Sequence, residues 1–319
     1  MRILFAGPLA CKVAQNLADA GPLVDYESCG AFAELIDRLP GADAIVIQNP
    51  GLDEGRALMA ALSDAGNSVR WIQVVTAGYE TLASLGVPEG IVVTNQGGAV
   101  APVVAEHALA LVLAQQRRLS EVWARSSRKE WNKTFLPPIA ALEGQTVTVL
   151  GYGHVGRNLA SRAKAFDARV IGVTRRPHAD PFADEMHPLS ALPEILPQSD
   201  VLAVTIALTP ETRHIVGASE LALLKPGAVL VNVSRGGTVD PGALADALHE
   251  GRLSAALLDV TEPEPLPPES PLWQAPNLVI SPHVAGAGSA RVIGRICAVV
   301  ADNIGRYRAG APLANQVHV

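Results

Sequence analysis

The sequence predicts an α/β protein built from two open parallel-sheet domains. The first observation is a strand, a glycine turn, a helix and a second strand between residues 147 and 173, about the length that a βαβ unit needs. The second is the alternation of strand-like and helix-like segments in the first hundred residues, which is typical of parallel strands joined by crossover helices. The third is the length, because 319 residues suffice for two domains.

Composition excludes several classes of protein. Hydrophobic residues make up 49% of the chain and charged residues 18%, which favours a globular protein with a large core over a disordered one. The net charge of -6, without a long basic run, gives no footprint for nucleic acid. Every long apolar stretch is interrupted by a charge, Pro or Gly, so no membrane span is expected.

The cysteines and the N-terminus indicate a cytoplasmic chain. Cys11, Cys29 and Cys297 are odd in number, far apart and not in metal spacing, so we expect reduced thiols. The chain enters a strand at once, so no signal peptide is expected. His107 and His154 have no metal-ligand companions at helical spacing, and we predict no metal.

Apolar runs and their breakers place the elements of the first part. The expected strands are 2–6, 44–47, 71–75 and 91–94, and the expected helices are 31–38, stopped by Pro40-Gly41, and 55–65. A long apolar helix is expected over 100–119. Residues 120–143 are expected to be irregular, and Trp123 and Trp131 there favour a dimer contact, with a free surface loop as the alternative.

The central motif is G-x-G-x-x-G at residues 151–156, directly after an apolar run and before a helix over 157–166 and a strand over 168–173. Gly151 permits the tight turn, Gly153 lets the backbone approach a pyrophosphate, and Gly156 allows close helix packing. The helix N-terminus attracts phosphate. We therefore predict a dinucleotide site formed by Gly151, Tyr152, Gly153, His154, Val155 and Gly156.

The remaining elements continue the same alternation. The expected strands are 201–206, 228–233, 255–258 and 278–280, and the expected helices are 241–250 and 288–306. Residues 208–212 are expected to cap a helix-like segment after the strand over 201–206, and Leu208 and Thr209 are expected at the cofactor.

Three chemically complementary residues, Arg235, Glu264 and His283, come after predicted strands or in the loop that leaves one. Each alone is typical of a surface charge or a structural residue. Ligands of open α/β sheets bind beyond the carboxyl ends of the strands, however. Arg offers a planar fork to a carboxylate or keto oxygen, His exchanges a proton near neutral pH, and a carboxylate orients the imidazole.

These residues lie in sequence segments that resemble the D-2-hydroxyacid dehydrogenase family of glyoxylate, hydroxypyruvate and phosphoglycerate dehydrogenases. The spacing of 29 residues from Arg235 to Glu264, and 19 more to His283, fits that family. The matching segments cover nearly the whole chain and are Val93–Asn95, Val104–Leu109, the glycine turn, Asn232–Gly236, Leu258–Val260, Glu264–Pro267 and Ser281–His283.

The resemblance implies hydride transfer between a nicotinamide and a 2-keto acid. It makes His283 the general acid, Glu264 its partner and Arg235 the group that binds the keto oxygen and carboxylate. It also implies that backbone amides of Ala77 and Gly78 take the substrate carboxylate and that Asp259 lies near the nicotinamide carboxamide.

The resemblance also implies the domain organisation. A Rossmann dinucleotide-binding domain, 99–284, would be inserted into a flavodoxin-like substrate domain made of 1–98 and 285–319. The domains would close over the cofactor, and the protein would be a homodimer.

The residues that select between NAD and NADP, here called the selector residues, are Thr174, Arg175 and Arg176, and they depart from the family's NAD pattern. Thr174 stands where NAD-specific members carry an acidic residue, and Arg175 and Arg176 follow. Without the carboxylate a 2'-phosphate is not repelled, and two guanidinium groups can bind it. We predict NADP(H) over NAD(H), with a solvated surface pair of arginines as the alternative.

The substrate loop reads Gly78-Tyr79-Glu80, where the family often has Gly, Val or Phe, and Asp. Tyr79 either lines the substrate pocket or covers the sheet edge, so the sequence does not identify the side chain of the substrate. We expect a reductase of glyoxylate or hydroxypyruvate type. The alternative is a dinucleotide-sensing, co-repressor-like binding protein with little turnover, disfavoured by a chain that ends 36 residues after His283 without a disordered tail.

Overall fold

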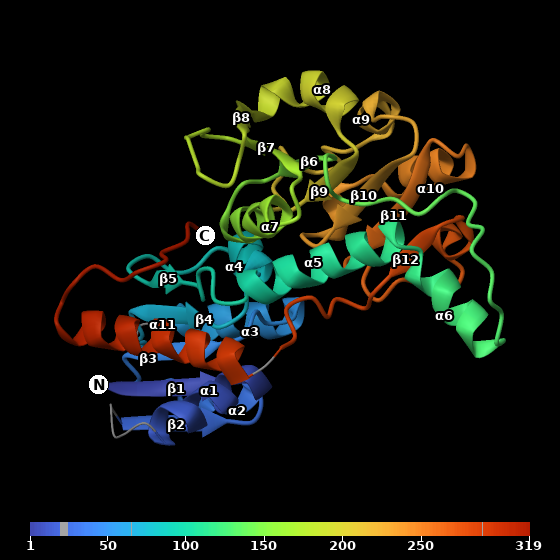
Figure 1. Ribbon diagram of the computed structural model, residues 1–319. Helices are drawn as coiled ribbons and strands as arrows, with labels where there is room; N and C mark the ends of the chain where they lie inside the picture. The colour runs from blue at the N-terminus through green and yellow to red at the C-terminus, as the bar shows by residue number, and fades with distance from the viewer. Residues whose placement is uncertain (20–24, 65, 289) are drawn as a thin grey trace. The chain divides into compact units, whose positions relative to one another are not determined.

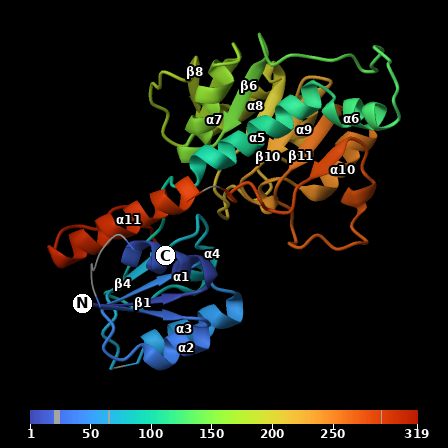
Figure 2. The same ribbon diagram turned by 60° about the horizontal axis from the view of Figure 1, so that its bottom comes forward.

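The computed structural model describes residues 1–19, 25–64, 66–288 and 290–319. The chain divides into two compact units, Met1–Val100 with Gly288–Val319, and Ala101–Ala287. These divisions fall a few residues from the domain boundaries expected from the sequence. Figure 1 and Figure 2 show the labelled elements of each unit in two views.

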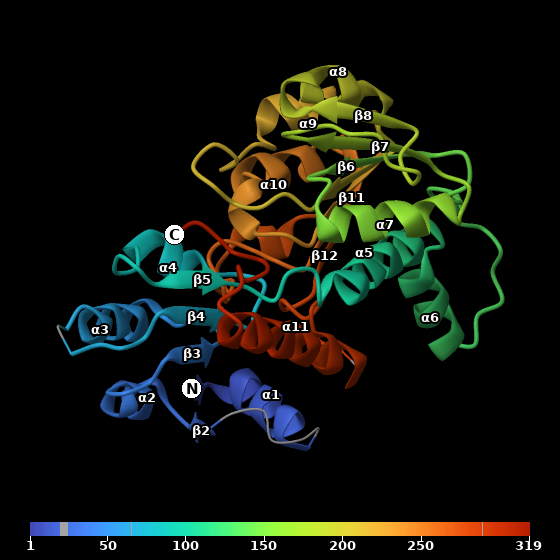
Figure 3. The ribbon, with the colours of Figure 1, turned by 90° about the vertical axis from the view of Figure 1, so that its left-hand side faces the viewer.

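The first unit is a five-stranded parallel sheet with the order β2-β1-β3-β4-β5, the order of flavodoxin-like sheets. Helix α1 packs on α11, while α3 contacts both α2 and α4. Figure 3 shows these two groups of helices on opposite faces of the sheet. Its elements are β1 (Arg2–Ala6), α1 (Pro8–Asp19), β2 (Asp25–Cys29), α2 (Phe32–Arg38), β3 (Ala44–Ile47), α3 (Leu52–Leu62), β4 (Trp71–Val74), α4 (Glu80–Leu85), β5 (Val92–Thr94) and α11 (Ala290–Arg308).

The second unit is a seven-stranded parallel sheet with the order β12-β11-β10-β9-β6-β7-β8. The strand order reverses between β6 and β9, and in such sheets the ligand binds at this point. Its elements are α5 (Ala101–Gln116), α6 (Leu119–Ser127), β6 (Thr146–Leu150), α7 (His154–Lys164), β7 (Arg169–Thr174), β8 (Glu185–Pro188), α8 (Leu192–Ile195), β9 (Val201–Val204), α9 (Ala218–Leu223), β10 (Ala228–Asn232), α10 (Pro241–His249), β11 (Leu253–Leu258) and β12 (Leu278–Ile280).

Helices cover both faces of the second sheet, with α5 and α7 on one side and α8, α9 and α10 on the other (Figure 3). Both faces of the central strands are therefore buried, and β6 and β10 are buried at every position, which explains their continuous apolar runs. Thr148 is one of the buried polar residues in these strands, and its hydroxyl lies 2.6 Å from that of the equally buried Ser199. Every described helix is too short or too polar to span a bilayer.

The prediction that residues 120–143 are irregular is wrong for the first third of the segment, because α6 covers Leu119–Ser127. Arg118 adopts a left-handed conformation (φ 51°) and separates α6 from α5. On α6, Glu121 forms ion pairs with Arg118 and with Arg125 one turn later, a spacing that stabilises a helix. The aromatic residues and the following prolines obscured this local signal.

The prediction of a helix capped by residues 208–212 is also wrong. Residues 210–214 form turns, and the hydroxyl of Thr212 donates to the carbonyl of Ala207 at 2.7 Å. Helix α9 begins only at Ala218, where Glu220 accepts a hydrogen bond from the amide of Gly217. Thr212 thus closes a loop rather than capping a helix.

Several elements were not predicted, namely helix α1 and the shorter β2, α4 and β8 among others. Helix α3 begins earlier than predicted, at Leu52, because Glu54 accepts from the amide of Gly51 and fixes its first turn. Residues 65 and 289, within the predicted helices 55–65 and 288–306, lie outside the described residues.

Candidate dinucleotide and active site

The glycine turn follows β6 at the point where the strand order reverses. Gly151 has φ 98°, a left-handed conformation that L side chains rarely adopt, and a Cβ atom there would overlap the backbone of Ile206. A Cβ on Gly156 would overlap the carbonyl oxygen of Gly151. These two glycines are therefore required by the fold itself.

Gly153 differs, because it has ordinary φ and a Cβ there would meet nothing within 4 Å. The protein does not need glycine at this position, whereas a ligand that approaches the backbone does. Gly153 is also the N-cap of α7 and offers no side-chain cap to the helix. Because the first amides of the helix are left to a ligand, the turn fits a dinucleotide pyrophosphate.

The other predicted residues of the turn differ in exposure. His154 begins α7 and is exposed, and Val155 is half-buried. Tyr152 is buried, and its hydroxyl donates to Asp180 Oδ1 at 3.1 Å. The side chain of Tyr152 therefore points into the protein rather than toward a phosphate.

The predicted selector residues lie at the carboxyl end of β7, next to β6. Thr174 is the last residue of this strand and is half-buried, and Arg175 and Arg176 follow it and are exposed. Leu208 and Thr209 follow β9, on the other side of the reversal, and the amide of Thr209 donates to the hydroxyl of Thr212 at 2.7 Å. These residues thus follow β7 and β9, the two strands that flank β6.

The structure brings His283 and Glu264 together. Nδ1 of His283 lies 2.7 Å from Oε2 of Glu264, and the other carboxylate oxygen accepts from the amide of Thr261 at 2.9 Å. The side chains are 49% and 37% exposed, respectively, so a small molecule can reach the pair. Since Nδ1 is occupied, Nε2 is the nitrogen that can exchange a proton with a ligand.

The backbone at His283 is held in an uncommon conformation. His283 has φ 52°, and its amide donates to the carbonyl oxygen of Asp259 at 2.8 Å. A non-glycine residue in this region costs free energy that surrounding contacts must offset. One such contact comes from Asp259, which directly follows β11.

Asp259 supplies further contacts through its buried carboxylate. Oδ1 accepts from the hydroxyl of Ser281 at 2.6 Å and the amide of Val284 at 3.0 Å, and Oδ2 accepts from the amide of Ala285 at 2.9 Å. The sequence predicted Asp259 only as a cofactor contact. Its hydrogen bonds anchor the chain on both sides of His283.

His107 of α5 extends this network, which the sequence did not reveal. Its Nε2 lies 2.9 Å from the hydroxyl of Ser281. The Ser281 hydroxyl donates its only proton to Asp259, so His107 must be the donor to Ser281. These two residues are 174 positions apart, and only the fold shows that they meet.

Arg235 lies in the turn that follows β10. Its guanidinium donates from Nη1 to the carbonyl of Ser234 at 2.7 Å, and the turn is closed by Thr238, whose hydroxyl donates to the carbonyl of Arg235. A Cβ on Gly236 would overlap the backbone of Thr261. The turn that carries Arg235 therefore lies directly against the loop that carries Glu264.

Ala77 and Gly78 belong to the first unit and follow β4. The hydroxyl of Thr76 donates to the carbonyl of Gly78 at 2.9 Å and accepts from the amide of Asn49 at 3.0 Å, which fixes the loop. Tyr79 packs against the hydrophobic core of this unit. This packing favours the interpretation that Tyr79 covers the sheet.

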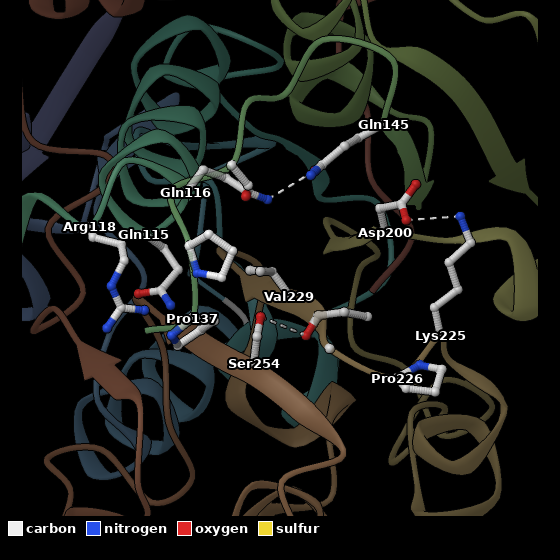
Figure 4. Close-up of a pocket in the computed structure, with 14 residues that line it drawn as sticks. Gln115, Gln116, Arg118, Pro137, Gln145, Asp200, Lys225, Pro226, Val229 and Ser254 are labelled. Atoms are coloured by element: carbon white, nitrogen blue, oxygen red, sulfur yellow. Dashed lines mark hydrogen bonds and ion pairs between the residues drawn. The ribbon is translucent and has the colours of Figure 1, made fainter. Parts of the chain in front are cut away.

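A cavity of about 230 Å³ lies at the opposite, amino end of the second sheet (Figure 4). Gln145 and Asp200 line it just before β6 and β9. Four of its polar side chains pair with one another, since Gln116 donates to Gln145 at 2.9 Å and Lys225 to Asp200 at 2.8 Å. The cavity is therefore separate from the residues described above, which lie at the carboxyl ends of the strands.

Comparisons with known proteins agree with this architecture. Residues 109–285 match the family model "D-isomer specific 2-hydroxyacid dehydrogenase, NAD binding domain". A glyoxylate reductase of Aeropyrum pernix is 38% identical over 237 residues, which cover 72% of this chain and 70% of that protein.

Two solved structures match nearly the whole chain. A D-isomer specific 2-hydroxyacid dehydrogenase family protein from Aeromonas salmonicida is 28% identical, with a TM-score of 0.88 over 99% of this chain and 98% of that one. An NADPH-dependent glyoxylate/hydroxypyruvate reductase from Sinorhizobium meliloti, solved with NADP and malonate, is 29% identical, with a TM-score of 0.79 over 99% and 96% of the chains.

Proposed function

Since the chain belongs to the D-isomer specific 2-hydroxyacid dehydrogenase family, we propose that it reduces small 2-keto acids of the glyoxylate and hydroxypyruvate type, with NADPH preferred over NADH. The product is the corresponding 2-hydroxy acid, in the D configuration where that acid is chiral. The observation that carries this proposal is the pair formed by His283 and Glu264 at 2.7 Å, at the carboxyl edge of the sheet that also carries the glycine turn.

The roles of the side chains follow from their chemistry. A bound reduced nicotinamide supplies the hydride. Arg235 binds the carboxylate and keto oxygen of the substrate and stabilises the negative charge that develops on that oxygen. Nε2 of His283 gives its proton to the new alkoxide, while Glu264 holds the ring through Nδ1. Ala77 and Gly78 receive the substrate carboxylate through backbone amides, as the family resemblance implies.

Residues that follow β6, β7 and β9 would hold the cofactor. The amides after Gly153 take the pyrophosphate, and Leu208 and Thr209 contribute from the loop after β9. Asp259 would lie near the nicotinamide carboxamide, as the family resemblance implies, and its carboxylate also fixes the chain just after His283.

Three residues support the preference for NADPH. Thr174 provides no negative charge at the end of β7, and Arg175 and Arg176 are exposed beside it. A 2'-phosphate can bind such guanidinium groups through paired, charge-assisted hydrogen bonds. The Sinorhizobium meliloti relative, which is NADPH-dependent, is consistent with this assignment.

The test is the oxidation of NADPH and NADH, measured in parallel with glyoxylate, hydroxypyruvate, pyruvate and phenylpyruvate. We expect NADPH oxidation well above NADH oxidation, with glyoxylate and hydroxypyruvate among the best substrates. Oxidation of NADH alone would contradict the cofactor assignment and keep the reaction. Tight NADPH binding without NADPH oxidation in the presence of any of the four acids would contradict the proposed substrates.

We also propose that the protein is a homodimer that buries α6 and the segment after it. Trp123, Trp131 and Leu136 are 64%, 92% and 82% exposed in the single chain, and such apolar side chains are typical of an interface. Light scattering of the protein should give twice the chain mass, and Trp123→Ala with Trp131→Ala should shift it toward the monomer. A monomeric wild-type protein would contradict this assignment.

A further inference from the structure

The loop between β7 and β8, residues 175–184, begins with the two arginines of the selector and is tied back to the glycine turn by Asp180. Asp180 Oδ1 accepts from the hydroxyl of Tyr152 at 3.1 Å and from the amide of Phe182 at 3.0 Å. Oδ2 accepts from Nε of Arg157 at 2.6 Å. Although it lies in a surface loop, the carboxylate side chain is only 6% exposed.

Two partners of Asp180 lie outside its loop, Tyr152 in the glycine turn and Arg157 on helix α7, which follows that turn. Tyr152 stands between Gly151 and Gly153, and its ring lies over Gly172 of β7, where a Cβ would come within 2.7 Å of Tyr152 Cδ2. Arg157 belongs to the first turns of α7, and its guanidinium also lies over the ring of Phe182, 4.9 Å from the centroid. One carboxylate thus joins the turn, the helix and the loop.

The charge state of Asp180 suits this role. Burial opposes ionisation, but hydrogen bonds from Phe182, Arg157 and Tyr152 outweigh it, so the pKa of Asp180 is lowered. Burial, together with the charge of Asp180, raises the pKa of Tyr152, so its hydroxyl remains a donor. The ion pair with Asp180 occupies Arg157, whose side chain is 50% exposed, and Arg175 and Arg176 at the start of the loop are exposed as well.

We propose that Asp180 is a positioning residue for cofactor selection: by fixing the loop to the glycine turn, it holds Arg175 and Arg176 where a 2'-phosphate of the bound nucleotide would lie. This inference rests on the proposed preference for NADPH. A loop already held in place loses less conformational entropy on binding, so loss of Asp180 weakens the phosphate contacts. The nucleotide parts that bind elsewhere are unaffected.

The test measures binding of nucleotide fragments by calorimetry, without turnover. Adenosine 2',5'-bisphosphate reports the 2'-phosphate contact, and adenosine 5'-monophosphate reports the rest of the adenosine site. We expect Asp180→Asn to lower the affinity for the bisphosphate about tenfold and to change that for the monophosphate less than about twofold. Tyr152→Phe, which removes one of the contacts, should lower the bisphosphate affinity by about threefold.

Asp184→Asn is the matched control. Asp184 ends the same loop and accepts from the amide of Val170 and from Lys164, but makes no described contact with the glycine turn. It should keep the wild-type ratio of the two affinities. Equal loss in Asp184→Asn, or parallel loss of both ligands in Asp180→Asn, would overturn the positioning role.

The wild-type protein separates this inference from the proposed function. If it binds both fragments equally, the preference for NADPH fails and the positioning role fails with it. If it prefers the bisphosphate but Asp180→Asn and Tyr152→Phe keep that preference, only the inference is overturned. Should Asp180→Asn fail to fold, the Tyr152→Phe result decides.

Discussion

Nδ1 of His283 lies 2.7 Å from Oε2 of Glu264, although the two residues come from different loops. The amide of Thr261 holds the other oxygen of Glu264, and Asp259 holds the backbone of His283. The pair is thus fixed from both sides before any substrate binds. In an enzyme, such preorganisation lowers the cost of aligning an acid with its substrate.

His283→Gln should lower kcat by about 10²- to 10⁴-fold, because a positioned general acid contributes that much. The dissociation constant for NADPH should change little, since His283 is assigned to the substrate. Stopped-flow turnover and fluorescence titration measure the two quantities. Wild-type turnover of this variant would rule out the proposed acid.

Thr174→Asp combined with Arg175→Ala should lower kcat/KM for NADPH by at least about tenfold and raise the ratio in favour of NADH. The new carboxylate repels a 2'-phosphate and can accept hydrogen bonds from the ribose hydroxyls. Arg306→Ala is a suitable control, because Arg306 is an exposed arginine paired with Asp302 on α11 of the first unit. An unchanged KM for NADPH in the double variant would show that these residues do not select the cofactor.

The glycine turn offers a pair of substitutions with opposite outcomes. Gly156→Ala should lower the melting temperature, because its Cβ would overlap the carbonyl oxygen of Gly151. Gly153→Ala should fold normally, since its Cβ meets nothing within 4 Å, but should bind NADPH at least about tenfold more weakly. Calorimetric melting and NADPH titration distinguish the two, and normal NADPH binding by Gly153→Ala would argue against a pyrophosphate at this position.

Asp259→Asn should destabilise the second unit by about 1–3 kcal/mol, because an amide cannot accept at both ends and leaves a buried donor unpaired. Its kcat should also fall, as the chain around His283 loosens. Ser281→Ala removes only the hydroxyl that donates to Asp259 and should cost less. Denaturant unfolding of the two variants provides the measurement, and equal stability of Asp259→Asn and wild type would contradict the anchoring role.

Alkaline pH should reveal the buried hydroxyl of Tyr152. Its pKa is raised in the folded protein, while an unfolded tyrosine ionises near pH 10. Its contribution to stability is therefore fully present below about pH 10 and is lost as the pH rises above that value. Tyrosinate absorbance should show one residue fewer ionising late in Tyr152→Phe than in the wild type, and identical late titrations would contradict the prediction. Tyr307, whose pKa is also raised, ionises late in both proteins.

Local patterns in the sequence determined the fold class and most strands. Continuous apolar runs such as β6 and β10 indicated strands buried on both faces, and the glycine spacing indicated the turn. Short or polar elements were missed, because β2 and β8 have few buried positions and weak periodicity. In α6, charge pairs at helical spacing were outweighed by aromatic residues that suggested a loop.

The residue types and spacing of Arg235, Glu264 and His283 predicted proton transfer beside an anion-binding arginine. Each of the three follows a strand of one parallel sheet or lies in the loop that leaves one. Only the tertiary structure decided which atoms meet. The contact of His107 with Ser281 and the burial of Asp259 depend on segments far apart in the chain. The tie from Asp180 to Tyr152 and Arg157 joins a loop to a turn across 28 and 23 residues. Such contacts have no sequence period, because they arise from the packing of one element against another.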